Sequence, residues 1–376
     1  MTVATTGSVA TKDGGALGSA ERGHHPTCAP MKTARRLWPH QKSALEAIME
    51  HFGTKGRHRD RCQLVMAPGT GKTLVSLRLA EKVASSGLVV VTVPTIALLG
   101  QTLAAYTADA SRRHDYLAVC SDPMVEAKAE GGNKGLSGQE RRDLERQIAR
   151  DEAELATWAR VVIAAEDIEA ALVERRRDRT TVALVTHASV GRLAGVMGLM
   201  GITADLAVTD EAHRAAGVPG TAADEDDGTV HLGEVVTKLL PAKRRLFTTA
   251  TPKIVRLRNS RGGEVKSETF SSMDDANLFG PEAFRYDFVQ AVEAGILVRY
   301  RVVVLVARSE DVMRAIRSGL AVDVDDKLMS ADQAAVYLGM AQTVHDQGIA
   351  TLLSFHSTVA RARRFAEAYK HVHQSA

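Results

Sequence analysis

A short glycine-rich stretch constrains the fold of this chain more than any other feature of its sequence. Residues 66–73 read MAPGTGKT; they follow an apolar run at 62–65 and precede a segment, 74–84, with apolar residues at helical spacing. A strand, a tight glycine turn and a helix start form a cradle for phosphate. In such a cradle, glycine lets backbone N–H groups approach the oxygens, and the helix N-terminus adds partial positive charge. The stretch therefore predicts an α/β domain that binds a nucleotide.

Individual residues of this loop have separate expected roles. Lys72 is expected to reach the β- and γ-phosphates of ATP, and the Thr73 hydroxyl to bind Mg²⁺. One departure from the general pattern is Met66, which stands where the first glycine of such loops usually lies. The residues expected to contact the nucleotide here are Pro68, Gly69, Thr70, Gly71, Lys72 and Thr73.

A pair of carboxylates forms the second candidate site. Asp210 and Glu211 follow the apolar run 206–208. A strand that ends in two acids places them at the carboxyl edge of a parallel sheet, where ligands of such folds bind. There Asp210 can hold Mg²⁺ through water and Glu211 can polarise an attacking water molecule. Acidic residues also cap helices, but downstream of a Gly-Lys-Thr loop the pair predicts phosphoryl chemistry.

Small hydroxyl residues follow a third predicted strand. Thr249 and Thr251 follow the run 245–247. Such residues at a strand end can bridge the carboxylate site to a neighbouring surface through hydrogen bonds, or form an ordinary turn.

Short apolar runs alternate with helical patterns along most of the chain, which predicts an α/β fold with a mostly parallel sheet. Several runs are continuous in Val and Leu, as expected for strands buried on both faces. The segment 144–162 has apolar residues at helical spacing, ending at Val162, and predicts a helix. The predicted strands of the first domain are 63–66, 88–93, 116–120, 182–186, 206–209 and 245–249.

A new alternation of apolar runs and helical patterns begins near residue 299. Residues 301–306 and 351–355 read as strands separated by a helical region, which predicts the beginning of a second α/β domain. At the other end, residues 1–23 are rich in Gly, Ala, Thr and Ser, which predicts a disordered tail at 1–34.

Composition narrows the protein class. The 376 residues can hold two domains, and they contain no apolar run of about 18 residues, so no membrane contact is predicted. The three cysteines, Cys28, Cys62 and Cys120, form no close pair, which favours a reducing cytoplasm over a disulfide framework. A net charge of +3 is compatible with nucleic-acid binding but does not argue for it.

With these three sites in this order, the chain resembles superfamily 2 helicases and translocases of the DEAH-box type. Residues 37–41 (LWPHQ) resemble the segment in which a glutamine reads the adenine edge, which implicates Gln41. Residues 93–101 and 186–189 resemble two motifs that contact the nucleic-acid backbone. The resemblance thereby implies nucleic-acid contacts at Thr95 and His187.

The resemblance continues towards the C-terminus. Residues 249–251 (TAT) resemble the motif that couples hydrolysis to strand movement, so that His213, Thr249 and Thr251 are implied as coupling residues. Residues 354–357 (SFHS) resemble a motif at the start of the second RecA-like domain, which implies a nucleic-acid contact at His356.

Two further stretches narrow the subgroup. Residues 210–217 (DEAHRAAG), and 273–281 (MDDANLFGP) leading into 295–301, resemble bacterial restriction-type and plasmid- or phage-borne helicases, which act on double-stranded DNA. Pro68 stands where this subgroup usually has Thr, and the N–H it lacks implies modestly weaker nucleotide binding. The resemblance implies a RecA-like ATP-binding domain at 35–298 and the beginning of a second, truncated RecA-like domain at 299–376.

The family's last motifs, which supply arginine fingers, have no match here. Arg361, Arg363 and Arg364 have a different spacing and predict a basic helix face. A finger is worth about 10³–10⁵ in phosphoryl-transfer rate, so rapid hydrolysis is expected to need a partner chain.

The resemblance therefore implies an ATP- and Mg²⁺-dependent DNA helicase or translocase that is incomplete as an isolated chain. The alternative is a non-hydrolysing regulator, or helicase remnant, that binds nucleotide and DNA. A different phosphate-loop enzyme, such as a kinase, is disfavoured by the order of the later motifs.

Overall fold

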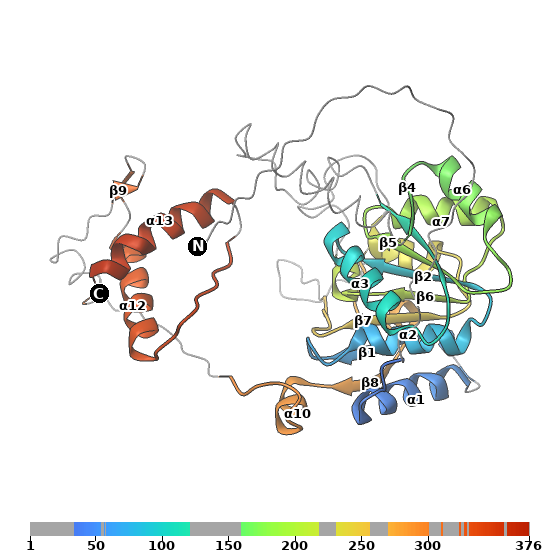
Figure 1. The fold of residues 1–376 in the computed structure, drawn as a ribbon, viewed down its shortest axis with the longest axis horizontal. Helices are drawn as coiled ribbons and strands as arrows, with labels where there is room; N and C mark the ends of the chain where they lie inside the picture. The colour runs from blue at the N-terminus through green and yellow to red at the C-terminus, as the bar shows by residue number, and fades with distance from the viewer. Residues whose placement is uncertain are drawn as a thin grey trace, which may run out of the picture.

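The computed structural model describes residues 34–53, 56, 58–120, 159–217, 231–255, 270–300, 310, 323–324, 327–328, 331–356 and 359–375. Its centre is an eight-stranded sheet in which all neighbouring strands run parallel, in the order β4-β3-β5-β2-β6-β7-β1-β8 (Figure 1). The strands are β1 (Arg61–Met66), β2 (Leu88–Val93), β3 (Asp115–Val119), β4 (Arg160–Val162), β5 (Thr181–Thr186), β6 (Leu206–Thr209), β7 (Arg245–Thr249) and β8 (Glu282–Tyr286).

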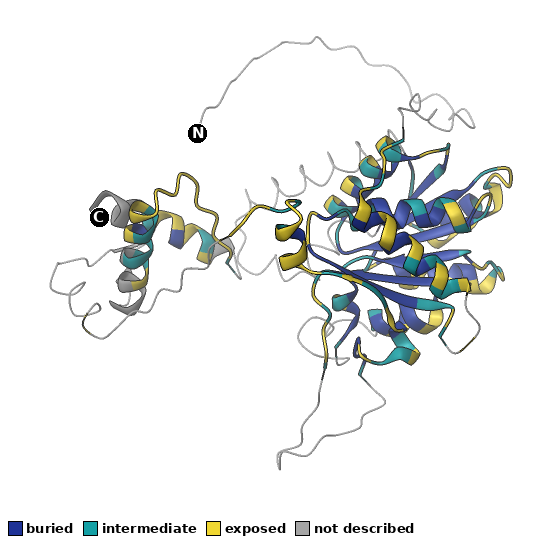
Figure 2. Ribbon diagram, turned by 90° about the horizontal axis from the view of Figure 1, so that it is seen from below, coloured by how far each residue is buried: buried dark blue, intermediate teal, exposed yellow. Residues whose placement is uncertain are grey.

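Helices cover both faces of this sheet and leave the strands between two apolar clusters. One cluster contains α1 (Pro39–Gly53), α2 (Lys72–Val83) and α3 (Ile96–Asp109). The other contains α6 (Ala165–Glu174), α7 (Val190–Leu199) and the π-helical turn η2 (Val235–Leu239). The remaining elements of this part are η1 (Ala212–Ala215), α8 (Leu232–Glu234), α9 (Ala276–Phe279) and α10 (Phe288–Glu293). Figure 2 shows the buried strands between helices whose outer faces are exposed.

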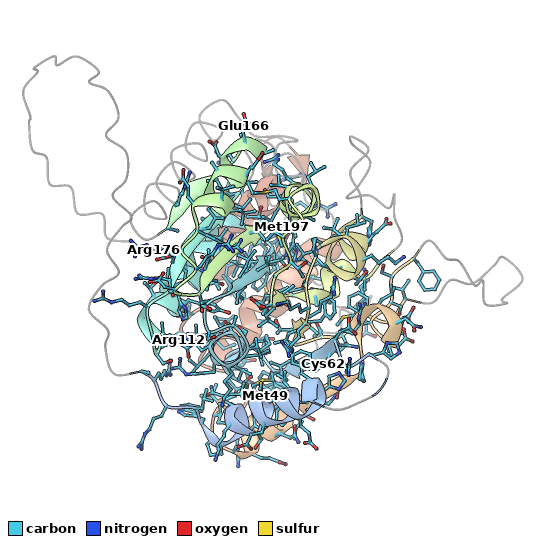
Figure 3. All side chains as sticks on the ribbon, turned by 90° about the vertical axis from the view of Figure 1, so that its right-hand side faces the viewer. Met49, Cys62, Arg112, Glu166, Arg176 and Met197 are labelled. Carbon is cyan, nitrogen blue, oxygen red and sulfur yellow. The ribbon has the colours of Figure 1, made fainter. Side chains whose placement is uncertain are left out.

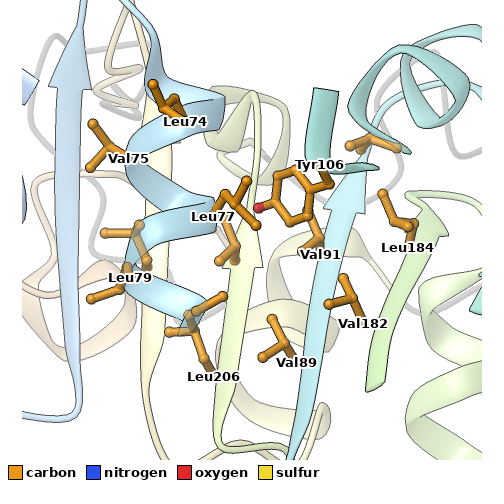
Figure 4. Close-up of a cluster of buried hydrophobic side chains, with 14 of the residues drawn as sticks. Leu74, Val75, Leu77, Leu79, Val89, Val91, Tyr106, Val182, Leu184 and Leu206 are labelled. Atoms are coloured by element: carbon orange, nitrogen blue, oxygen red, sulfur yellow. The ribbon is translucent and has the colours of Figure 1, made fainter. Parts of the chain in front are cut away.

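The core forms because α2 turns one apolar face towards the sheet. Leu74 and Leu77 of α2 pack in the same cluster as Val89, Val91 and Leu206 from the strands (Figure 4). Each such side chain contributes about 1.5–3 kcal/mol when fully buried. Strands β2 and β5 are buried along their whole length, which confirms the expected two-sided burial.

The two faces of the sheet carry separate apolar clusters. Met49 of α1 packs against the first cluster, whereas Met197 of α7 belongs to the second, and Figure 3 shows the two side chains well separated. Cys62 of β1 and Cys120 beyond β3 are both fully buried.

All six predicted strands of the first domain are present, and two further strands complete the sheet at its edges. The helix predicted through Val162 is wrong at its end, because Val162 is the last residue of strand β4. The rest of that prediction, residues 144–158, lies outside the described residues. Strand β8 was not predicted from the sequence.

The C-terminal part contains β9 (Asp323–Val324), β10 (Lys327–Leu328), α12 (Ala331–Asp346) and α13 (Val359–Ser375). The strand predicted at 351–355 is wrong: this segment is irregular, and Leu353 and Phe355 are 74% and 88% exposed. A strand persists only with a neighbour to pair with, and no described strand pairs with this segment. The strand predicted at 301–306, and residues 1–33 of the predicted tail, lie outside the described residues. Arg361, Arg363 and Arg364 are exposed on α13, which confirms the predicted basic helix face.

Within the described ranges, no helix is both long and apolar enough to cross a membrane.

Candidate nucleotide site

The glycine loop connects the end of β1 to the start of α2. Gly69 and Gly71 have φ angles of 79° and 94°, in the left-handed region that glycine adopts without a steric penalty. A Cβ atom on Gly71 would lie 2.2 Å from Nε2 of Gln41. Since α2 begins directly after Gly71, its positive end faces this loop. The predicted strand, turn and helix start are therefore all present.

Hydrogen bonds hold the loop in a compact shape. The Thr70 hydroxyl donates to the Ala67 carbonyl oxygen at 2.6 Å. The Lys72 ammonium donates to the Met66 carbonyl oxygen at 3.1 Å, which carries the side chain from the helix start back towards the end of β1. Pro68 is exposed at the turn.

Helix α1 packs directly against this loop. Nε2 of Gln41 donates to the Thr70 carbonyl oxygen at 3.0 Å, and its Oε1 accepts from the backbone N–H of Trp38 at 2.9 Å. His40 reaches the same Thr70 oxygen through Nε2 at 2.9 Å, and its ring stacks on Tyr286 of β8 at 4.5 Å. Gln41 thus lies beside the loop, with its amide bonded to protein groups.

Asp210 follows β6 and faces the loop. Its backbone N–H donates to the Thr92 carbonyl oxygen at 2.9 Å, and its Oδ1 accepts from the Thr248 hydroxyl at 2.6 Å. Lys72, Thr73, Asp210 and Thr248 line one small pocket. Carboxylate and hydroxyl oxygens are ligands that Mg²⁺ prefers, usually with several waters retained. The donor set of this pocket therefore fits a magnesium ion.

The second carboxylate lies in an unusual backbone conformation. Glu211 has φ 48° and ψ 45°, the left-handed region in which a residue with a Cβ is strained. Its Oε2 lies 3.2 Å from Nδ1 of His213, and that nitrogen lies 3.0 Å from the Thr249 hydroxyl oxygen. The backbone N–H of Thr251 donates to the same hydroxyl at 3.1 Å. The three predicted coupling residues therefore form a continuous chain of contacts that starts at Glu211.

His187 also belongs to this site. Its Nε2 donates to the Asp210 carbonyl oxygen at 3.1 Å, and its backbone N–H donates to the Val93 carbonyl oxygen at 2.8 Å. Desolvation by burial, with a smaller contribution from the positive charge of Arg214, lowers the pKa of His187 to about 3. The ring is therefore neutral near pH 7, and its single N–H is the one bonded to Asp210.

The other expected nucleic-acid contacts lie in different places. Thr95 caps α3, with its hydroxyl oxygen accepting from the Leu98 backbone N–H at 3.2 Å. It follows β2, next to β5 and therefore next to the His187 loop. His356 has its contacts inside the C-terminal segment, with Ser354 at 3.1 Å and the Phe365 ring at 4.8 Å. These contacts do not bring His356 to the pocket.

Sequence reasoning missed three residues of this site. Thr248 carried no signal of its own, because its contact with Asp210 depends on the pairing of β6 with β7, in which Thr209 lies opposite Phe247. His40 adjoins Gln41 but carries no motif of its own. Tyr286 had no signal, since β8 was not predicted.

Comparisons with known proteins agree with this fold. The family described as "Type III restriction enzyme, res subunit" matches residues 35–254. The structure of the ATP-dependent Type ISP restriction-modification enzyme LlaBIII bound to DNA is similar over 84% of this chain, with 23% identity and a TM-score of 0.56. A nuclease-deletion mutant of the Type ISP enzyme LlaGI, in complex with a DNA substrate mimic, is similar over 70%, with 26% identity and a TM-score of 0.50.

These similarities have a limited extent. The matched region spans only 19% of the LlaBIII chain and 18% of the LlaGI chain. No curated protein sequence matches the chain significantly. What the comparisons share is a RecA-like fold and a restriction-type superfamily 2 helicase family, as the sequence predicted.

Proposed function

Because the chain belongs to the type III restriction enzyme res subunit family, we propose that it forms the ATP-binding part of an ATP-dependent DNA helicase or translocase. One observation carries this proposal: Lys72, Thr73 and Asp210 come from two distant parts of the sequence and line one pocket at the carboxyl edge of the sheet. A cation, a hydroxyl and a carboxylate in one pocket suit a nucleotide phosphate with its Mg²⁺.

In this proposal each part of the site has one role. The backbone of 68–73 and the Lys72 ammonium bind the phosphates, and Gln41 lies where it can read the adenine base. Thr73 and Asp210 hold Mg²⁺, which when bound neutralises charge on the phosphate oxygens. Glu211 orients the attacking water, and its contact with His213 connects it to Thr249 and Thr251. These assignments correspond to a DEAH-type motif set.

The proposed nucleic-acid surface lies at the loops after β2 and β5. Thr95 and the loop that contains His187 follow neighbouring strands, so both loops open at the same edge of the sheet. The two structurally similar restriction enzymes are described in complexes with DNA or a DNA mimic, which favours DNA, and the subgroup resemblance favours the duplex form. We assign the ATP-binding domain to residues 35–298 and a second domain, carrying His356, to 299–376.

The proposal is tested by steady-state ATP hydrolysis on the purified chain, with no DNA, with single-stranded DNA and with duplex DNA. Hydrolysis that rises with duplex DNA and disappears in Lys72→Ala is the expected result, since the ammonium is needed at the γ-phosphate. Lys82→Ala is the matched control, because Lys82 is an exposed lysine ten residues further along the same helix. Hydrolysis that survives in Lys72→Ala would contradict the assigned site.

If the native chain hydrolyses ATP only at the background rate, a parallel measurement of nucleotide binding distinguishes the two remaining possibilities. Nucleotide binding without hydrolysis, restored to hydrolysis by a partner chain, supports a motor whose arginine finger comes in trans. Nucleotide and DNA binding that no partner converts to hydrolysis, and that persists in Glu211→Gln, supports the regulator instead.

A further inference from the structure

His187 is bonded to two other loops at the carboxyl edge of the sheet. Its backbone N–H is bonded to the last residue of β2, Val93, and its ring to Asp210 after β6. The turn that carries it is itself fixed, because the Thr186 hydroxyl donates to the Ser189 hydroxyl at 3.1 Å and the Ser189 N–H to the Thr186 carbonyl oxygen at 3.0 Å. A movement of this turn therefore reaches both neighbouring loops.

The bond to Asp210 acts on one particular peptide group. The Asp210 carbonyl belongs to the peptide plane that leads into Glu211, so a donor on that oxygen opposes rotation of the plane. The next torsion along the chain is φ of Glu211, which has the strained value of 48°. The backbone N–H and the carboxylate of Asp210 are bonded to Thr92 and Thr248, and His187 fixes the remaining polar group of this residue.

We propose that His187 is a positioning residue that couples occupancy of the nucleic-acid surface to the orientation of the peptide between Asp210 and Glu211. The inference rests on the proposed function for the identity of that surface. DNA bound to the loops after β2 and β5 fixes the position of the His187 turn. The turn then fixes the carboxylate of Asp210, proposed to hold Mg²⁺, relative to the carboxylate of Glu211, proposed to orient the attacking water.

Three substitutions separate this role from simple packing. In His187→Gln the side-chain amide nitrogen extends about as far as Nε2 and still donates. In His187→Asn the amide nitrogen stops near the position of Nδ1 and cannot reach the Asp210 oxygen, while His187→Leu fills a similar volume with no donor. If His187 only fills space, His187→Gln and His187→Asn should affect the response to DNA similarly. If His187 positions the Asp210 peptide, only His187→Gln should retain that response.

The measurement is the affinity of the purified full chain for a fluorescent ATP analogue with Mg²⁺, with and without a short DNA duplex. In the native chain we expect the duplex to tighten nucleotide binding about fivefold or more. His187→Gln keeps most of this effect, whereas His187→Asn and His187→Leu reduce it to less than about twofold. If thermal unfolding shows that His187→Leu does not fold, the comparison of His187→Gln with His187→Asn still tests the inference.

His51→Leu is the matched control. His51 also contacts backbone carbonyl oxygens, those of His58 and Arg61, but it lies at the far end of α1, away from the pocket. It is expected to keep the duplex effect. Full coupling in His187→Asn, or its loss in His187→Gln, would overturn the inference alone. A native chain that binds nucleotide but does not respond to the duplex would also overturn it, whereas a native chain that binds no nucleotide would refute the proposed function itself.

Discussion

Each polar group of Asp210 is hydrogen-bonded, and these bonds oppose the backbone strain at its neighbour Glu211. A left-handed conformation costs a residue with a Cβ roughly 1–2 kcal/mol, while one neutral hydrogen bond contributes about 0.5–1.5 kcal/mol. A single hydrogen bond would therefore barely offset the conformational strain at Glu211. The structure supplies three at Asp210, from Thr92, Thr248 and His187, so the strained peptide is held with a margin.

The bond from Thr248 leads to a prediction about magnesium. Thr248→Val removes the hydroxyl donor from the Asp210 carboxylate with almost no change in shape. Bonds to charged groups contribute about 1.5–3 kcal/mol, so we expect the Mg²⁺ concentration for half-maximal nucleotide binding to rise about tenfold or more. A titration of nucleotide binding with Mg²⁺ measures this shift. Thr237→Val is the control, since the Thr237 hydroxyl of η2 donates to the Gly233 carbonyl oxygen of α8, away from Asp210. An unchanged Mg²⁺ requirement in Thr248→Val would contradict the prediction.

Residues with a motif could be predicted from the sequence, and residues that act through a neighbouring strand could not. Lys72, Thr73 and Asp210 carry chemistry that their local pattern already specifies. The partners His40 and Thr248 depend instead on which segments become neighbours in the folded chain. That order is set by packing of the whole sheet, and no local pattern encodes it.

Among the secondary-structure elements, the two strands that were not predicted from the sequence also lack a clear local pattern. β4 and β8 are the edges of the sheet. β4 has only three residues, and β8 carries the charged residues Glu282 and Arg285, which are salt-bridged at its exposed side. Edge strands are commonly short or charged, because an apolar edge would invite pairing with another chain. The sequence of β8 therefore lacks a continuous apolar run, whereas Val162 of β4 continues the helical spacing of the segment before it, which predicts a helix.

Glu81 connects α2 with the segments after α3 and before β3, and its ionisation predicts how the stability of the fold depends on pH. Its carboxylate accepts from Arg78 of α2 at 2.7 Å and from the Ser111 N–H after α3 at 2.6 Å, and it lies 3.5 Å from His114 before β3. Burial alone would raise the pKa of Glu81, but the hydrogen bonds from His114, Ser111 and Arg78 outweigh it and lower the pKa to about 2. The ionised form is therefore the one that stabilises the fold.

The sign of the effect follows from the lowered pKa. The contribution of Glu81 is fully present above the unfolded value of about 4.5 and is lost as the pH falls from there towards 2. We expect Glu81→Gln to lower the free energy of unfolding by about 3 kcal/mol at pH 7, and the difference from the native chain to shrink between pH 4.5 and 3. Urea unfolding at several pH values measures it. A difference that stays constant over this range would show that the carboxylate charge is not responsible.

At the scale of the whole molecule, both apolar clusters close within the part that ends at Tyr300. Phe279 of α9 completes the second cluster, and Phe284 and Tyr286 of β8 pack on the first. The helices α12 and α13 pack on each other through the ring contact between Tyr337 and Phe365, and Figure 1 shows them apart from the sheet. The stability of the nucleotide site is therefore expected to come from the first part alone.

A shortened chain of residues 34–300 tests this division. We expect it to unfold in one cooperative thermal transition within a few degrees of the full chain, because no residue of either cluster around the sheet is removed. Its Mg²⁺-dependent nucleotide affinity should be unchanged, since Gln41, Lys72, Thr73 and Asp210 are all retained. Its DNA affinity should fall, because the proposed contact at His356 is lost. A broad, non-cooperative transition would mean that the C-terminal part completes the core, and an unchanged DNA affinity would confine the nucleic-acid surface to the loops after β2 and β5.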